Sequence, residues 1–229
     1  MVWMAIQPVN EDLLEQIDQY IEQLFVPPDP ALEQNLIDAK DAGLPAIAVA
    51  PGQGRLMYLL AKISGAKRIL EIGTLGGYST TLLARSLPLD GKVVSLELSP
   101  VNAGVARKNL ERAGVSDLVE IRVGPANETL DKMIASKEAA FDLVFIDANK
   151  TGYVGYLNQV LQLSHSGTVI LSDNLIRHGA VLPGYPNPDA DARAITEFNK
   201  LIASHPRLES ILLPIVKGKV DGMAISRVK

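Results

Sequence analysis

The 229-residue sequence contains no cysteine, which excludes disulfides, thiolate metal sites and cysteine nucleophiles. It also has no apolar run approaching the roughly 18 residues that a membrane-spanning helix requires. The first residues, "MVWMAIQPVNEDLLEQ", lack the basic start and the sustained apolar stretch of a secretory signal. We therefore expect a cytoplasmic protein with no membrane partner.

Positive charge and aromatic side chains are also scarce. The formal net charge is −4, with 22 Lys and Arg against 26 Asp and Glu, so no overall field attracts a nucleic-acid backbone. Nucleic acid is therefore not an expected partner, although a local basic patch remains compatible with this charge. With 6 Tyr, 4 Phe and 1 Trp, few side chains are available to line an aromatic slot.

The sequence does contain an alternation of short apolar runs with helical segments. The runs are "RILEI", "KVVSLEL", "LVEIRV", "FDLVFI" and "GTVILS", and helices are expected near 78–86, 100–113, 126–136, 153–164 and 190–203. Strands buried on both faces and separated by helices indicate parallel βαβ units. Two final runs, "LESILLPIV" and "GMAISRV", have only "KGKVD" between them, which predicts an antiparallel hairpin. The predicted fold class is α/β, a single Rossmann-like domain over 1–229 with five parallel strands, a C-terminal antiparallel hairpin and helices on both faces.

The N-terminal part, residues 1–64, is interpreted as a helical segment that covers the site. Its first helix has one apolar stripe and ends at a group of prolines. This stripe either joins two copies of the chain or packs on the sheet. A second helix is expected over about 31–42, and a third follows the loop "AIAVAPGQG". The stripe consists of Leu13, Leu14, Ile17, Tyr20, Ile21 and Leu24, and the expected inward positions of the third helix are Leu56, Leu59, Leu60 and Ile63.

A glycine-rich turn follows the first strand of the alternation, in "LEIGTLGGYSTTLLA". Gly73, Gly76 and Gly77 lie where the backbone must turn tightly and approach a ligand. Their spacing is not G-x-G-x-x-G, and the acid Glu71 precedes them. A carboxylate is unfavourable beside a pyrophosphate but suits a ligand with a cationic amine or sulfonium. An ordinary strand–helix turn explains the glycines alone equally well.

A second acid, Glu97, ends the next strand. An acid at this place can accept hydrogen bonds from both hydroxyls of a ribose, although a solvated strand-end carboxylate is an equally simple explanation. Together with the acid–glycine loop, it indicates S-adenosylmethionine, an adenosine that carries a methionine tail. The segment "VGPANETL" is then expected to close over the adenine, with backbone groups near Ala126 at its edge.

Polar side chains also end the fourth and fifth strands: Asp147 in the first case, Asp173 and Asn174 in the second. Neighbouring strands lie about 4.8 Å apart, so these side chains can meet around one ion. Three oxygen donors suit Mg²⁺ or a similar hard cation. Alternatively, Asp147 binds only the cofactor and "DN" caps a turn. Lys150, taken alone, is an ordinary exposed lysine.

These segments, in this order, resemble the cation-dependent O-methyltransferases, the family that includes the caffeoyl-coenzyme A and catechol O-methyltransferases. The resemblance covers nearly the whole chain. "EIGTLGGYS" is similar to the family's cofactor loop, "FDLVFIDANK" and "LSDN" to its metal segments, and "AGV", "LP" and "DG" fall where the family has them. The resemblance implies Mg²⁺-dependent transfer of a methyl group from S-adenosylmethionine to a catechol-type phenolic substrate, by a homodimer.

The resemblance also implies a role for each matching residue. Lys150, beside Asp147, is the catalytic general base, or a cation that stabilises the phenolate. Arg177 and His178 stand in the acceptor loop in place of an aromatic wall, so the acceptor itself does not follow. Asn149 replaces an aspartate in the cofactor site. The implied metal ligands are Asp147, Asp173 and Asn174, and the implied cofactor contacts are Val49, Glu71, Gly73, Thr74, Ser79, Glu97, Ala126, Asp147 and Asn149.

Three other functions are compatible with parts of the pattern. A tRNA hydroxyl methyltransferase would share the fold and cofactor, but the acidic net charge disfavours it. An NAD-dependent dehydrogenase is disfavoured by the glycine spacing and the terminal hairpin. A cofactor-binding regulatory protein would not need the metal and base positions, which this chain retains.

Overall fold

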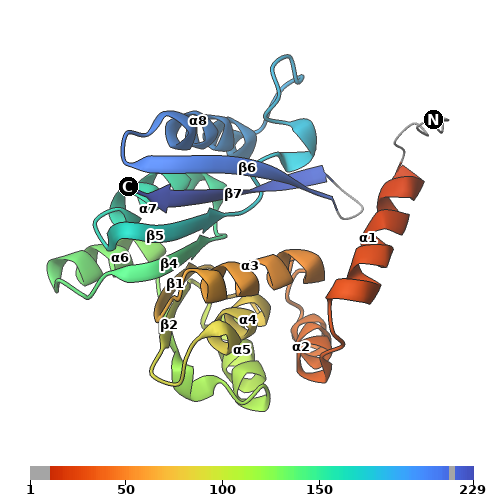
Figure 1. Ribbon diagram of the computed structural model, residues 1–229, viewed down its shortest axis with the longest axis vertical. Helices are drawn as coiled ribbons and strands as arrows, with labels where there is room; N and C mark the ends of the chain where they lie inside the picture. Colours follow the sequence, from red (N-terminus) through yellow and green to blue (C-terminus); the bar gives the residue numbers. More distant parts are fainter. Residues whose placement is uncertain (1–10, 217–219) are drawn as a thin grey trace, which may run out of the picture.

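The computed structural model describes residues 11–216 and 220–229, which form an α/β structure with helices on both faces of one sheet (Figure 1). This arrangement confirms the predicted fold class. The leader-free start at 1–10 and most of the hairpin connection, 217–219, lie outside the described residues. The described helices are α1 (Glu11–Phe25), α2 (Pro30–Asp41), α3 (Pro51–Ile63), α4 (Tyr78–Ser86), α5 (Pro100–Arg112), α6 (Ala126–Ala135), α7 (Tyr153–Val160) and α8 (Ala190–Ser204), with short 3-10 turns η1 (Ser116–Leu118), η2 (Lys150–Gly152) and η3 (Arg177–Gly179).

The sheet has the strand order β3-β2-β1-β4-β5-β7-β6. Strands β1 to β5 are parallel, whereas β7 pairs antiparallel with both β5 and β6, as expected for the terminal hairpin. The order reverses between β1 and β4, so the carboxyl ends of the central strands open into a crevice at this switch point. The strands are β1 (Arg68–Ile72), β2 (Lys92–Glu97), β3 (Val119–Val123), β4 (Phe141–Ile146), β5 (Ser164–Ser172), β6 (Leu208–Val216) and β7 (Val220–Val228).

Two hydrophobic layers sandwich the sheet. Helices α3, α4 and α5 cover one face, with Met57, Leu83 and Leu110 in the core. Helices α6, α7 and α8 cover the other, where Leu157 and Phe198 are fully buried. Because both faces of the central strands are covered, these strands read as continuous apolar runs and not as an alternating pattern.

The buried face of α3 differs from the predicted one. Leu59 is 42% exposed and Ile63 is 80% exposed, while Met57 and Ala61 are buried. A methyl group at Gly54 would lie 2.5 Å from the Leu82 side chain, so α3 lies against α4 too closely for large residues. Close helix packing, which the apolar pattern does not encode, therefore selected the small side chains. Leu56 and Leu60, also expected inward, are partly buried.

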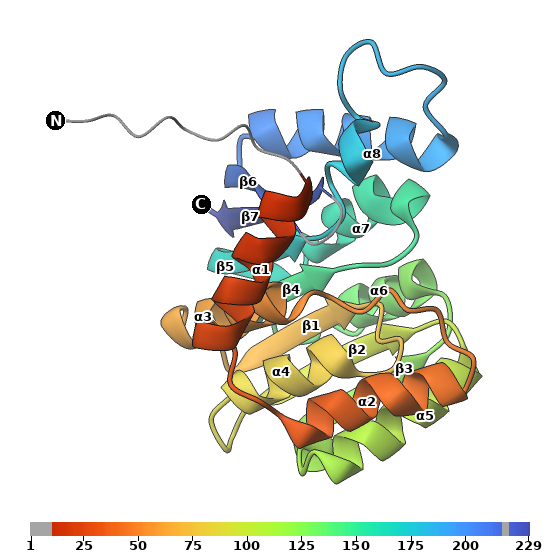
Figure 2. The same ribbon diagram turned by 90° about the vertical axis from the view of Figure 1, so that its right-hand side faces the viewer.

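The N-terminal helices extend from the α3 side of the molecule. Helix α2 contacts α4 and α5 (Figure 2), and α1 contacts α3. The apolar stripe of α1 is largely uncovered: Tyr20, Leu24 and Phe25 are 63%, 60% and 64% exposed. The stripe therefore does not pack on the sheet, one of the two arrangements expected for it.

Within the described part of the chain, no helix combines the length and the apolar character needed to cross a bilayer. The cytoplasmic location remains a prediction of the sequence.

Candidate active site

A cavity of about 1510 Å³ lies at the carboxyl ends of the central strands. Its wall includes every residue of the predicted cofactor, metal and acceptor sites except Glu71, which lies behind it. The N-terminal part contributes Asn35, Lys40 and the loop from Leu44 to Ala50 to the same wall. The fold thus gathers residues from five loops around one space.

The glycine loop between β1 and α4 passes very close to the end of β4. A Cβ on Gly73, whose φ is 107°, would lie 2.0 Å from the backbone oxygen of Asp147, so only glycine fits there. The carbonyl of Gly76 accepts hydrogen bonds from the side-chain amides of Asn35 and Asn109, each at 2.9 Å. These donors, from α2 and α5, fix the loop from its outer side.

Glu71 is fully buried behind this loop. The hydroxyls of Ser79, Thr80 and Ser95 donate to its carboxyl oxygens at 2.5–2.6 Å. Burial raises the pKa of Glu71 to about 7 in spite of these donors, and the negative charge of Asp147 adds to the effect. The hydrogen-bonded Ser79 lines the cavity, so Glu71 acts on a ligand through it; a direct contact of Glu71 with a methionine moiety remains a prediction.

Glu97 ends β2 at the cavity wall, as predicted. Its Oε2 accepts hydrogen bonds from the backbone nitrogens of Thr74 and Leu75, at 3.2 and 2.8 Å. Its Oε1 accepts from the backbone of Ser99 and from the Asn102 amide, at 2.9 and 3.2 Å. The carboxylate therefore joins the glycine loop to the start of α5 and is held in one orientation.

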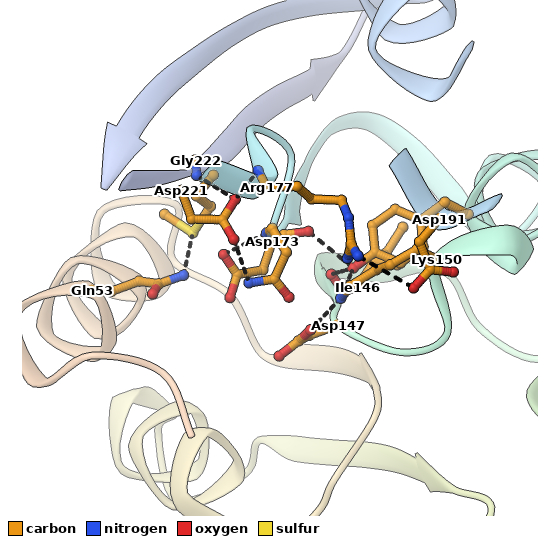
Figure 3. A network of polar contacts seen from close by, with 12 residues as sticks. Gln53, Ile146, Asp147, Lys150, Asp173, Arg177, Asp191, Asp221 and Gly222 are labelled. Carbon is orange, nitrogen blue, oxygen red and sulfur yellow. Dashed lines mark hydrogen bonds and ion pairs between the residues drawn. The ribbon is translucent and has the colours of Figure 1, made fainter. Parts of the chain in front are cut away.

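Asp147 and Asp173 end the neighbouring strands β4 and β5 and face the same space (Figure 3). Burial raises the pKa of Asp173 to about 7, and the negative charge of Asp147 raises it further. Asn174 follows directly, with its backbone nitrogen on Asp173 Oδ1 at 2.8 Å and a left-handed φ of 60°. The three side chains predicted to meet at these strand ends therefore do so.

This donor set fits a hard divalent cation. In the described residues no group of three or more His, Asp or Glu is placed to hold a metal, so two carboxylates and one amide are the available donors here. All of them offer oxygen, which Mg²⁺ prefers. A positive charge between them would also relieve the repulsion that raises the pKa of Asp173.

Lys150 lies beside this pair at the start of η2. Its Nζ donates to Asp147 Oδ1 at 2.8 Å and to Tyr153 Oη at 2.9 Å. Tyr153 is completely buried, and its hydroxyl lies 3.0 Å from the backbone oxygen of Asp173 and 3.2 Å from that of Ile146. The lysine, far from being an ordinary exposed side chain, is positioned by both strands of the pair.

The acceptor loop contains two consecutive left-handed residues, Arg177 and His178, with φ of 47° and 55°. Both line the cavity. The Arg177 guanidinium lies 3.3 Å from Asp189 and 3.5 Å from Asp191, across the loop that precedes α8. Asn149 also lines the cavity, and its Oδ1 accepts a hydrogen bond from the Tyr156 hydroxyl.

Sequence reasoning missed three residues of this site. Gln53 and Asp221 line the cavity, and Tyr153 holds Lys150 from below the wall. Gln53 lies 3.7 Å from the Met223 sulfur, which joins α3 to β7. Tyr153 looks like any aromatic helix residue, and Asp221 stands in an apparent turn "DG", so neither carries a signal without the fold.

Comparison with known proteins places this geometry in context. Residues 29–228 match the family model described as O-methyltransferase. A catechol O-methyltransferase of Mycobacterium tuberculosis is 44% identical over 93% of this chain and 95% of its own, and one of Niastella koreensis is 40% identical over 96% and 100%. The crystal structure of an O-methyltransferase from Bacillus cereus in complex with SAH superposes with a TM-score of 0.91, at 42% identity over 96% of this chain and all of that one.

Proposed function

The chain belongs to the O-methyltransferase family, and from this membership we propose that it methylates one hydroxyl of a catechol-type phenol beside a bound divalent cation. The coarser statement, that the protein is an S-adenosylmethionine-dependent O-methyltransferase, follows from the family and from the SAH complex of its structural neighbour. The observation that most supports the finer one is the pair Asp147 and Asp173, which shares one cavity with Glu97 and the glycine loop.

The wall of the cavity offers a matching partner for each part of S-adenosylmethionine, whose sulfonium supplies the methyl group that an oxygen nucleophile accepts. Glu97 can accept hydrogen bonds from the ribose hydroxyls. The turn at Gly124–Ala126, at the start of α6, can cover the adenine. The remaining proposed contacts, mostly around the methionine moiety, are Val49, Gly73, Thr74, Ser79, Asp147 and Asn149, with Glu71 behind Ser79.

Asp147, Asp173 and Asn174 are proposed to hold the cation. When bound, a divalent cation such as Mg²⁺ lowers the pKa of a neighbouring hydroxyl and orients two adjacent oxygens of one ring. The two carboxylates come from rigid strand ends, which keeps the acceptor at a fixed distance from the cofactor loop.

Lys150 is proposed to receive the proton that leaves the acceptor hydroxyl, at Nζ. Its hydrogen bonds to Asp147 Oδ1 and Tyr153 Oη hold Nζ within reach of any oxygen between the two carboxylates. Burial of the site excludes water that would otherwise compete for that proton.

A catechol-type acceptor is supported by the names of two relatives at 40–44% identity. Arg177 and His178 at the rim are proposed to contact the ring substituents, because both line the cavity next to Asn174. The acidic net charge and the absence of any observation that favours RNA leave tRNA as an alternative only for the test.

The test is methyl transfer to caffeic acid and to its analogue with a single hydroxyl, with Mg²⁺ and with a chelator. The expected result is a monomethyl ether from caffeic acid alone, lost on chelation and restored by Mg²⁺. Equal turnover of both acceptors, or turnover unaffected by the chelator, would contradict the proposal. Methylation of bulk tRNA under the same conditions would favour the alternative.

We also propose that two copies of the chain associate through α1. Its exposed residues Ile17, Tyr20, Ile21, Leu24 and Phe25 recur at helical spacing and form one apolar stripe. A stripe of this size on a surface helix is typical of an interface.

A further inference from the structure

The first turn of β7 reaches back to the proposed cation site through Asp221. Its Oδ1 accepts hydrogen bonds from the backbone nitrogens of Ile176, Arg177 and Gly222, at 3.0, 2.9 and 2.8 Å. Its Oδ2 accepts from the side-chain nitrogen of Asn174, at 3.2 Å. Figure 3 shows Asp221 beside Asp173, at the end of the two antiparallel strands.

These bonds hold an unusual stretch of backbone. Asn174, Arg177 and His178 all have left-handed φ angles, which non-glycine residues rarely adopt together. The backbone nitrogen of Leu175 donates to the Gly222 oxygen at 2.9 Å, so the loop is joined to β7 by backbone as well. Asp221 is therefore the common acceptor around which the loop after β5 folds.

The bond to Asn174 also settles the orientation of its amide. An amide has a donor end and an acceptor end of nearly the same shape, and an unrestrained asparagine can present either to the cavity. A carboxylate can only accept hydrogen bonds, so the end of Asn174 that faces Asp221 is its NH₂ group. The oxygen is the end that remains for a cation.

We propose that Asp221 is a positioning residue of the cation site, because it fixes Asn174 with its oxygen available as a ligand. The inference rests on the proposed function, since it assumes that Asn174 binds a cation. Asp221 itself touches neither the cation nor the acceptor in this role. Groups that orient metal ligands in this way usually contribute about 10–100-fold to metal affinity.

The first variant is Asp221→Asn. The three backbone nitrogens hold an oxygen at the Oδ1 position, so the new NH₂ group of residue 221 would face the NH₂ group of Asn174. To avoid two opposed donors the Asn174 amide must rotate, which turns its NH₂ group towards the cation. We expect the dissociation constant for Mn²⁺ to rise about 10–100-fold, while that for S-adenosylmethionine stays within about twofold. Both are measured by calorimetry on the full chain.

The second variant exchanges the two partners, as Asn174→Asp with Asp221→Asn. The amide at 221 then donates to the carboxylate at 174, which offers the cation an oxygen again. Asn174→Asp alone places two carboxylates against each other without a proton between them. We therefore expect Asp221→Asn to strengthen Mn²⁺ binding in the Asn174→Asp background by tenfold or more, although it weakens binding in the wild-type background.

Asp142→Asn is the matched control. Asp142 Oδ2 also accepts two backbone hydrogen bonds, from Lys67 and Arg68 at 2.8 Å, but at the opposite end of the sheet. Its replacement should lower the melting temperature and leave the Mn²⁺ dissociation constant unchanged. A stability loss alone therefore does not imitate the expected result.

The outcomes separate this inference from the proposed function. A wild-type chain that binds no Mn²⁺ contradicts the cation site itself. A wild type that binds Mn²⁺, with an Asp221→Asn variant of equal affinity, overturns the role of Asp221 and leaves the site intact. If Asp221→Asn alone does not fold, the Asn174→Asp background decides: the absence of any gain there overturns the inference.

Discussion

At the scale of single residues, burial decides how each carboxyl group of the cavity behaves. Glu71 and Asp173 are both inaccessible, and in each the loss of water is the main cause of a pKa near 7. They differ in their neighbours: Glu71 is surrounded by three hydroxyl donors, whereas Asp173 faces Asp147 across the cavity. Glu71 is thus neutralised most easily by a proton, and the Asp pair by a cation.

The buried Glu71 makes stability depend on pH. Between its ordinary pKa of 4.5 and about 7, the folded protein keeps a proton that the unfolded chain has released. The free energy of unfolding of the ligand-free protein should therefore fall as pH rises through this window, by up to about 3 kcal/mol from this group. Urea unfolding at pH 5 and pH 8, for wild type and Glu71→Gln, measures it. Glu71→Gln should lack this part of the decrease; parallel pH dependences would refute the assignment.

Lys150 can be tested with two substitutions that separate proton transfer from charge. Lys150→Ala removes both, and Lys150→Arg keeps a positive charge but cannot accept a proton at neutral pH. If Nζ receives the hydroxyl proton, both variants should lose about 10²–10⁴-fold in kcat. Single-turnover methyl transfer measures the loss, with the dissociation constant of S-adenosylmethionine as control. An Arg variant close to wild type would instead assign Lys150 an electrostatic role.

Residues that act on other residues were the hardest to foresee. Asp147, Asp173 and Asn174 were predicted because strand ends bring polar side chains together at one sheet edge. Asp221 contacts the same site from the other end of the chain, and only the antiparallel pairing of β7 with β5 brings it there. No spacing rule in the sequence connects it with Asn174.

At the scale of elements, the β1–α4 loop shows how tightly the cofactor site is built. Gly73→Ala would place a methyl group 2.0 Å from the Asp147 oxygen, so β1 and β4 must separate. We expect a stability loss above about 2 kcal/mol and weaker binding of S-adenosylmethionine. Gly65→Ala is the control, because Gly65 also has a positive φ, 66°, but nothing within 4 Å of an added Cβ. It should cost about 1 kcal/mol and leave binding unchanged. Equal effects of the two variants would show that close approach at Gly73 is unimportant.

Element boundaries were predictable where a residue type enforces them. β1 and α4 begin and end at the predicted residues, because the apolar run and the glycines that separate them are unambiguous. The helix expected over 153–164 ends at Val160, since the chain turns into β5 at Ser164, three residues before the predicted start. The face of α3 was wrong, because small residues at a close helix contact look like a polar or neutral face in the sequence.

At the scale of the whole molecule, the parallel order of the strands and the terminal hairpin followed from the apolar pattern alone. That pattern could not say where α1 would lie, because an amphipathic helix finds its apolar partner only in the assembled fold. The exposed stripe is the reason to expect a second copy of the chain.

The dimer is tested by Tyr20→Glu combined with Leu24→Lys, which places charges in the stripe without changing the net charge. Light scattering after size exclusion should give a dimer mass for wild type and a monomer mass for the variant. Gln16→Glu with Gln23→Lys introduces the same charges at exposed polar positions of α1 and should remain dimeric. A monomeric wild type at micromolar concentration would contradict the proposed association.

The cation beside the methyl donor is the central claim, and anomalous diffraction from crystals containing Mn²⁺ and SAH tests it most directly. The account predicts one anomalous peak per chain, about 2.0–2.3 Å from oxygens of Asp147, Asp173 and Asn174, and next to the cofactor sulfur. An occupied cofactor site with no peak between these three side chains, or with a peak held by other residues, would contradict it.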